Sequence, residues 1–191
     1  MYPLTAWATK EIFVGIQAQP GLDIVIGLKR QGQPAMHLTV DQFAALETHW
    51  EVITKYLNNE EKKAPHLQLD QHLVAVGRDC FGQAGMYIEN NATAEVFIFT
   101  HRSWFEMCKL RSCVQYNIRE KINARTALLY CLGEARKFVA NRPQTMSREQ
   151  YIQDFPRVFL SKASPCRETY ELLNYFYPMC SEWIYEHTDT S

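Results

Sequence analysis

Leu22-Asp-Ile-Val-Ile-Gly-Leu-Lys-Arg30 opens the stretch from Gly21 to Leu57 that decides the fold of this chain. Its apolar side chains recur at every second residue, which predicts a β-strand with one apolar face. Gln31-Gly-Gln-Pro34 then predicts a turn, and Ala35–Leu38 predicts a short returning strand. Upstream, Glu11–Gln17 shows the same alternation. A sheet whose strands are apolar on one side is expected to be covered on that side only.

The helix expected from Val40 to Leu57 carries the clearest local signals. Thr39 and Gln42 form a capping-box pattern, in which each side chain satisfies the other residue's backbone N–H. Asn58-Asn59 ends the helix, and the charged segment Glu60–Pro65 predicts a linker. The apolar stripe that should face the core consists of Phe43, Leu46, Trp50, Ile53 and Leu57.

A second, more divergent copy of this pattern follows at a constant distance. Thr100 lies 61 residues after Thr39, and the apolar positions of the two predicted helices match at that offset. The matching pairs are Phe43 with Trp104, Leu46 with Met107, Ile53 with Val114, and Leu57 with Ile118. Such self-similarity at a fixed period is the signature of an internal repeat.

The second copy predicts strands at His72–Arg78, Met86–Glu89 and Glu95–Thr100, followed by a helix from about Ser103 to Asn117. In the last of these strands both alternating sets of side chains are apolar, namely Val96 with Ile98 and Phe97 with Phe99. This second sheet is therefore expected to be covered on both faces.

The predicted fold class is α+β: tandem β-β-β-β-α repeats with pseudo-twofold symmetry, in which two antiparallel sheets carry packed helices, plus a C-terminal helical extension. The two repeat helices are expected to pack on each other as an internal pseudo-dimer. Residues 1–9 show no pattern and are expected to be an unanchored lead-in. The extension is expected to begin with a separate helix over Ile122–Val139, which Pro143 ends. The expected domains are residues 10–59, 66–118 and 119–187, the last packed on the two repeats.

Composition narrows the function classes. The chain has 191 residues, of which 47% are apolar and 21% charged, as is typical of a globular protein. No apolar window is long enough to span a bilayer and no secretory signal is apparent, so an intracellular protein, nuclear or cytoplasmic, without a membrane partner is expected. The six cysteines follow no zinc-ligand spacing, and the chain needs no disulfides. No cofactor is expected, and the absence of a phosphate loop, GxSxG or HExxH motif argues against an enzyme.

Charge is unevenly distributed along the chain. The formal net charge is −1, but basic residues gather after residue 101. A local excess of one sign can steer an anionic partner, although an ordinary solvated helix face would look the same. The basic residues concerned are Arg102, Lys109, Arg111, Arg119, Lys121, Arg125, Arg136, Lys137 and Arg142.

The strand Ile24-Val-Ile-Gly-Leu-Lys-Arg30 and the segment Met36-His-Leu-Thr-Val-Asp-Gln-Phe43 resemble the single-stranded-DNA-binding transcriptional coactivators of the positive-cofactor-four type. Two such repeats in one chain are similar to the plant Whirly proteins, which share a β-β-β-β-α duplication. The chain departs from both families, because the coactivators' basic Ser-rich tail and the Whirly Lys-rich signature are absent and its C-terminal helices belong to neither.

This resemblance implies a protein that binds single-stranded DNA or RNA, regulates transcription or replication and forms a dimer. The small size, the lack of targeting signals and the duplication would suit a viral or nuclear DNA-associated protein. Aromatic rings would stack on bases, and Lys or Arg side chains would neutralise phosphates. Five of the candidates also have a plainer interpretation: core or interface packing for Phe13 and Tyr87, a solubilising hairpin end for Lys29 and Arg30, and a strand position without a ligand for His37. The candidate contacts are Lys10, Phe13, Lys29, Arg30 and His37 on the first sheet, and Arg78, Tyr87 and Arg102 on the second.

A protein-interaction module is the alternative function. If the C-terminal helices covered the second sheet or docked a second protomer, nucleic-acid binding would be weak or lost. The protein would then be an oligomerising scaffold that keeps the fold. On the sequence alone, the first sheet is the expected site, since its strands are apolar on one side only.

Overall fold

The computed structural model describes residues 1–17, 22–78 and 82–140, together with Ser147 and Gln150. The chain divides into two compact units, the first made of Met1–Gln17 with Asp23–Arg119, and the second of Ala18–Leu22 with Glu120–Ser191. Both sheets and the candidate site belong to the first unit. The expected turn at Gln19–Gly21, the end of a helix at Pro143 and the expected helices after residue 150 lie outside the described residues.

The first sheet is antiparallel and has four strands in the order β1-β2-β3-β4. Its buried face contains Ile12, which pairs with Leu28, and Leu28 in turn pairs with Met36. All three side chains are at most 3% exposed. The period-two pattern therefore predicted the covered face correctly. The strands are β1 (Tyr2–Pro3), β2 (Lys10–Ile16), β3 (Ile24–Arg30) and β4 (Met36–Thr39).

The prediction that residues 1–9 form an unanchored lead-in is wrong. Tyr2 pairs with Ile12 across the β1–β2 ladder, and the backbone N–H of Leu4 donates to the Lys10 carbonyl at 2.7 Å. Leu4 is fully buried. A strand of two residues is too short for alternation to reveal it, so only its pairing with β2 identifies it.

The second sheet also has four antiparallel strands, in the order β5-β6-β7-β8. Its buried face contains Val74, Ile88 and Phe97, which are paired side by side across three strands and are at most 4% exposed. The strands are β5 (His66–Leu69), β6 (His72–Arg78), β7 (Ala84–Asn90) and β8 (Val96–Thr100).

The helix expected from Val40 to Leu57 is divided in two, α1 (Val40–Thr48) and α2 (Trp50–Leu57), with His49 at φ −102° and ψ 4° between them. The Thr48 hydroxyl donates to the Ala45 carbonyl at 2.7 Å, and His49 Nδ1 lies 3.1 Å from the same oxygen. Polar side chains that compete for main-chain carbonyls weaken a helix, which accounts for the break. The predicted capping box is confirmed at the α1 N-terminus.

α3 runs without interruption from His101 to Ala140. The separate helices expected at Ser103–Asn117 and Ile122–Val139 are therefore one helix, because neither Pro nor Gly separates them. Its start is capped reciprocally, since the Thr100 N–H donates to Ser103 Oγ at 2.9 Å and the Ser103 N–H donates to Thr100 Oγ1 at 3.3 Å. None of the described helices combines the length and the apolar character that crossing a membrane requires.

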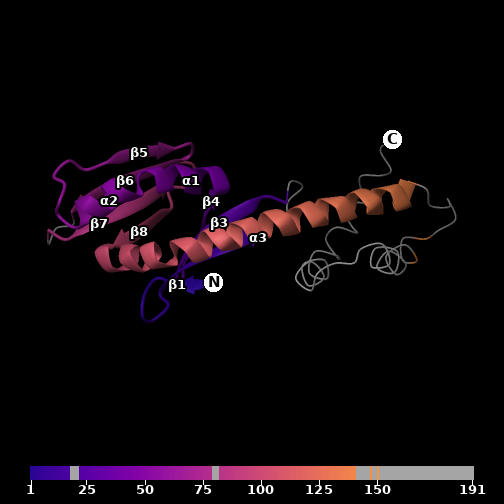
Figure 1. Cartoon of the computed structure of the whole chain (residues 1–191), viewed down its shortest axis with the longest axis horizontal. Coiled ribbons are helices and arrows are strands. Elements are labelled where there is room, and N and C mark those ends of the chain that lie inside the picture. The colour runs from indigo at the N-terminus through magenta and orange to yellow at the C-terminus, as the bar shows by residue number, and fades with distance from the viewer. Residues whose placement is uncertain (18–21, 79–81, 141–146, 148–149, 151–191) are drawn as a thin grey trace. The chain divides into compact units, whose positions relative to one another are not determined.

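The expected pairing of the two helical segments is confirmed. The rings of Trp50 in α2 and Trp104 in α3 lie 4.4 Å apart between centroids. Trp104 is fully buried, and its Nε1 donates to Thr54 Oγ1 at 2.9 Å. One cluster of buried side chains joins these helices to the inner faces of both sheets. In Figure 1, α2 accordingly lies close to β6 and β7, while α1 contacts β3, β4 and β5.

Candidate nucleic-acid interface

The outer face of the second sheet is exposed where the sequence predicted that it would be covered. Val96 and Ile98 in β8 are 42% and 47% exposed, while Phe97 and Phe99 between them are at most 4% exposed. Ile98 pairs with Tyr87, which pairs with Ala75, so these three side chains form one row across the outer face. Apolar character on both sides of β8 therefore does not mean burial on both sides.

A strip formed by two paired glycines, which lack side chains, runs beside this row. Gly77 of β6 pairs with Gly85 of β7, which pairs with Thr100 of β8. A Cβ atom added at Gly77 would meet nothing within 4 Å, whereas one at Gly85 would lie 3.2 Å from the Phe99 carbonyl oxygen. The strip leaves bare backbone on the face that carries Tyr87 and Ile98.

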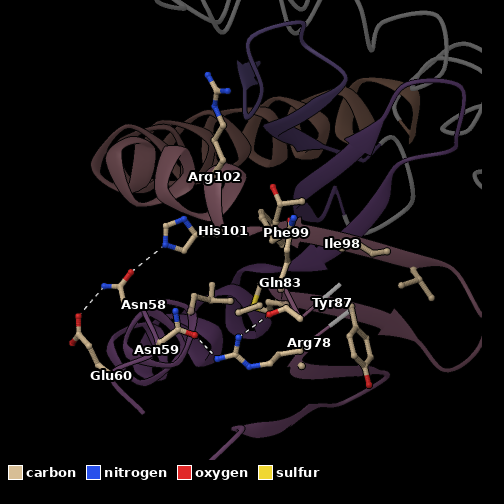
Figure 2. Close-up of a pocket in the computed structure, with 18 of the residues that line it drawn as sticks. Asn58, Asn59, Glu60, Arg78, Gln83, Tyr87, Ile98, Phe99, His101 and Arg102 are labelled. Atoms are coloured by element: carbon tan, nitrogen blue, oxygen red, sulfur yellow. Dashed lines mark hydrogen bonds between the residues drawn. The ribbon is translucent and has the colours of Figure 1, made fainter. Parts of the chain in front are cut away.

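A groove of about 1200 Å³ lies at this end of the sheet, where the outer face meets the end of α2 and the start of α3 (Figure 2). Its floor is the glycine strip with the row of Tyr87 and Ile98, and its walls come from the end of α2, the β6–β7 turn and the start of α3. Arg78, Tyr87 and Arg102, which sequence reasoning placed together, all contribute to the lining. The groove is also lined by Asn58, Asn59, Glu60, Glu89, Val96 and His101.

Arg78 is held in place at the side of the groove. Its Nη1 donates to the Gly82 carbonyl at 2.8 Å, and its Nη2 donates to the side-chain oxygen of Asn59. Asn59 follows the α2 C-cap and adopts a positive φ of 63°, a conformation that Asn tolerates better than most residues. The helix end therefore positions the guanidinium group, while α2 itself ends at the Asn pair that the sequence predicted.

The opposite wall is formed by the junction of β8 and α3. His101 Nε2 lies 3.3 Å from the side-chain oxygen of Asn58, and Asn58 Nδ2 donates to Glu60 at 3.1 Å. Arg102, the next residue, is exposed and makes no hydrogen bond or ion pair with any described residue. In Figure 2 its side chain extends away from Arg78, so it borders the groove without closing it.

Lys10 connects the first sheet to the edge of this groove. Its Nζ donates to the Ile98 carbonyl oxygen at 2.8 Å, across from β2 to β8. Burial, and to a lesser degree the charge of Arg30, holds the pKa of Lys10 below its usual value. Lys29 and Arg30 continue the basic surface at the end of β3, and both are exposed without a partner among the described residues. The excess of positive charge comes from these neighbouring residues, because Glu60 and Glu89 offset Arg78 and Arg102 within the groove itself.

Phe13 and His37 form a separate group on the outer face of the first sheet. The Phe13 ring lies across Gly27, where an added Cβ would fall 2.1 Å from the nearest ring carbon. The His37 ring meets it edge-on, with centroids 6.2 Å apart, and Gln17 Nε2 lies 3.2 Å from His37 Nδ1. Phe13 is half-buried and therefore packs on its own sheet while keeping part of its ring exposed.

The expectation that only the first sheet is open needs correction. On the outer face of the first sheet, Val25 is only 7% exposed, and Phe13 covers Gly27. The second sheet instead presents Ile98 and Val96 to solvent. Sequence reasoning missed these two residues, the glycine strip and His101; the Gly77 and Gly85 positions within strands were the available signal, because Gly in a strand often marks close approach by a ligand.

The described residues include free thiols but no metal-binding cluster. They contain no group of three or more His, Cys, Asp or Glu side chains arranged to hold a metal ion. Cys108 is a free thiol that accepts a hydrogen bond from Trp50 Nε1 at 3.1 Å, and burial raises its pKa. A thiol with a raised pKa is a poor nucleophile at neutral pH.

Comparison with known proteins does not assign the fold or the groove to a family. Searches of protein-family models, of curated proteins and of solved structures return no match.

Proposed function

We propose that this chain binds single-stranded nucleic acid in the groove at the end of the second sheet. The observation that carries the proposal is a groove that joins the Tyr87 and Ile98 row and the bare glycine strip, on the open face of the sheet, to Arg78 at the end of β6 and Arg102 at the start of α3. Aromatic rings such as that of Tyr87 stack with bases of any identity, and a bare backbone strip admits their close approach.

Phosphate neutralisation comes mainly from the surface next to the groove. Lys10 contacts the backbone of Ile98, and Lys29 and Arg30 lie at the same end of the first sheet. A strand whose bases lie on the Ile98 side would bring its phosphates toward these cations. Electrostatic contacts of this kind supply most of the affinity in non-specific binding and make it fall with salt.

The finer architecture belongs to the same proposal. We infer that residues 10–59 and 66–118 are two copies of one β-β-β-β-α unit. Support comes from the reciprocal caps at equivalent positions, Thr39 with Gln42 and Thr100 with Ser103. A duplicated sheet protein that binds single strands would act as a regulator of transcription or replication, and two of its copies could assemble as a dimer.

A protein-interaction scaffold is the second candidate, because Val96 and Ile98 are apolar and lie on the edge strand β8. Exposed edge strands pair readily with other chains. Light scattering distinguishes this reading: a stable oligomer that dissociates on Ile98→Glu substitution supports the scaffold, and a monomer unaffected by the change contradicts it.

Fluorescence anisotropy with labelled oligothymidine tests the nucleic-acid function directly. The wild-type protein should bind at low salt, with affinity falling steeply as salt is raised. Ile98→Glu should weaken binding at least tenfold, since it places a carboxylate on the face where bases would lie. Val52→Glu is the matched control, because Val52 in α2 is similarly exposed at 44% but lies outside the groove.

Absence of any binding by the wild-type protein at low salt would refute the function. Equal losses for Ile98→Glu and Val52→Glu would refute the groove as the site, because the effect would then follow net charge rather than position.

A further inference from the structure

The exposed side of α3 alternates cationic and aromatic side chains. Residues on this side follow a spacing of three and four, which places them on one face of a helix. Every one of them is exposed, whereas Trp104, Met107, Val114 and Ile118 on the opposite side are buried. The stripe consists of Arg102, Phe105, Lys109, Ser112, Tyr116 and Arg119.

The charge of this segment is strongly one-sided. Residues 101–119 contain four basic residues and a single carboxylate, Glu106. Glu106 forms an ion pair with Lys109 at 2.8 Å, and Arg111 forms one with Glu47 at 2.9 Å. Arg102 and Arg119, at the two ends of the stripe, have no hydrogen-bond or ion-pair partner among the described residues.

The stripe is continuous with the groove. His101 lines the groove, and its ring lies 4.8 Å from that of Phe105. Arg102 borders the groove as well, and Figure 2 shows its side chain directed away from the other labelled residues of the groove. From Phe105 the stripe extends to Tyr116, which is 63% exposed, and ends at Arg119, about 25 Å of helix from Arg102 at about 1.5 Å per residue.

We propose that this stripe of α3 is a second contact surface for single-stranded nucleic acid, along which a strand continues after it leaves the groove. The inference rests on the proposed function of the groove and adds the path of the strand. Charge complementarity favours a polyanion, and the interleaved Phe105 and Tyr116 rings favour one that carries bases, because rings and guanidinium groups both contact unpaired bases well.

A length series of oligothymidine tests this path. A strand of about six nucleotides should fill the groove alone, whereas one of about 20 nucleotides should reach the stripe and bind more tightly. The variant Lys109→Glu with Arg119→Glu should weaken the long strand about tenfold and leave the short strand within about twofold of wild type. Loss of two phosphate contacts should also lower the log–log salt slope of the long strand by about 1.4.

The matched control is Lys62→Glu with Lys63→Glu, which changes net charge equally on two exposed residues outside the stripe and groove. Tyr116→Ala, without any charge change, should weaken the long strand alone by about fivefold or more. The path along α3 is wrong if the long strand binds the stripe variant as tightly as it binds the wild type. It is also wrong if the control variant loses as much affinity for the long strand as the stripe variant does. Groove binding stands in both cases. If the wild-type protein binds neither strand, both proposals fall together.

Discussion

Lys10 Nζ, in the first sheet, donates a hydrogen bond to the carbonyl oxygen of Ile98, in the edge strand of the second sheet, at 2.8 Å. The contact satisfies a main-chain acceptor on the free side of β8, where no further strand pairs. It also brings a cation beside the side chain that forms the exposed part of the groove floor. A single residue therefore connects the basic end of the first sheet with the apolar face of the second.

Replacing Lys10 with Met should lower the free energy of unfolding by about 1 to 2 kcal/mol, because the Ile98 carbonyl loses a charge-assisted donor. Urea denaturation followed by circular dichroism measures the change. Lys29→Met is the control and should stay within about 0.5 kcal/mol of wild type, since Lys29 is exposed and makes no described contact. Equal stabilities for the two variants would show that the contact contributes nothing.

Lys29→Glu together with Arg30→Glu should reduce affinity for single-stranded oligonucleotides about tenfold without unfolding the protein. Both side chains are exposed at the end of β3, next to Lys10. Anisotropy titrations at two salt concentrations measure the loss, which should shrink as salt is raised. Unchanged affinity would remove the first sheet from the binding surface and leave the groove to act alone.

Gly27→Ala should destabilise the protein by about 1 to 3 kcal/mol, because the new methyl group would occupy the space of the Phe13 ring. Gly77→Ala is a matched control in a strand of the second sheet, where an added Cβ meets nothing within 4 Å. The double variant Gly27→Ala with Phe13→Ala should be less destabilised than the sum of its parts. Strict additivity in urea denaturation would argue against the contact.

Removing the hydroxyl of Thr54 by Thr54→Val should cost about 1 to 3 kcal/mol of folding free energy. The fully buried Trp104 would lose the acceptor for its indole N–H, which lies 2.9 Å from Thr54 Oγ1. Chemical denaturation measures this cost. Val52→Ala, at an exposed position of the same helix, should be close to neutral. A neutral Thr54→Val variant would contradict the described packing of α2 on α3.

Mild acid should destabilise the protein through His72. This side chain is 4% exposed, neither ring nitrogen has a hydrogen-bond partner among the described residues, and burial lowers its pKa although Asp70 opposes the shift. The unfolded chain therefore binds a proton at a higher pH than the folded protein, so the contribution of this group is fully present above about pH 6.5 and is lost as the pH falls below it.

His72→Leu should accordingly flatten the dependence of the unfolding free energy between about pH 7.5 and 5.5, where one such group contributes at most about 1.4 kcal/mol per pH unit. His66→Gln is the control, because His66 is exposed at the start of β5 and should leave the slope unchanged. A wild-type slope that survives His72→Leu would assign the pH dependence to other groups.

Some of the strands and helices could be predicted from the sequence and others could not. Alternation located β2, β3 and β6 to within one or two residues, and the Thr39 capping box located the start of α1. The sequence patterns missed β1, because a strand of two residues is recognisable only by its pairing. They also predicted two helices where α3 is continuous, although neither Pro nor Gly lies between the two predicted segments. The groove is lined by residues of β6, β7, β8, α2 and α3, which are far apart in the sequence. The sequence therefore predicted Arg78, Tyr87 and Arg102 as site residues but not the other side chains of the lining.

The sequence by itself determined which residues alternate along each strand, where the helices are capped, and which apolar stripe of each helix is buried. These properties depend on side-chain spacing and on hydrogen bonds between near neighbours, which a local pattern records. The tertiary structure alone decided that Ile98 is exposed while Val25 is buried, and that Lys10 reaches across to β8. A strand with two apolar faces does not specify which face is covered, because that depends on packing between elements far apart in the chain.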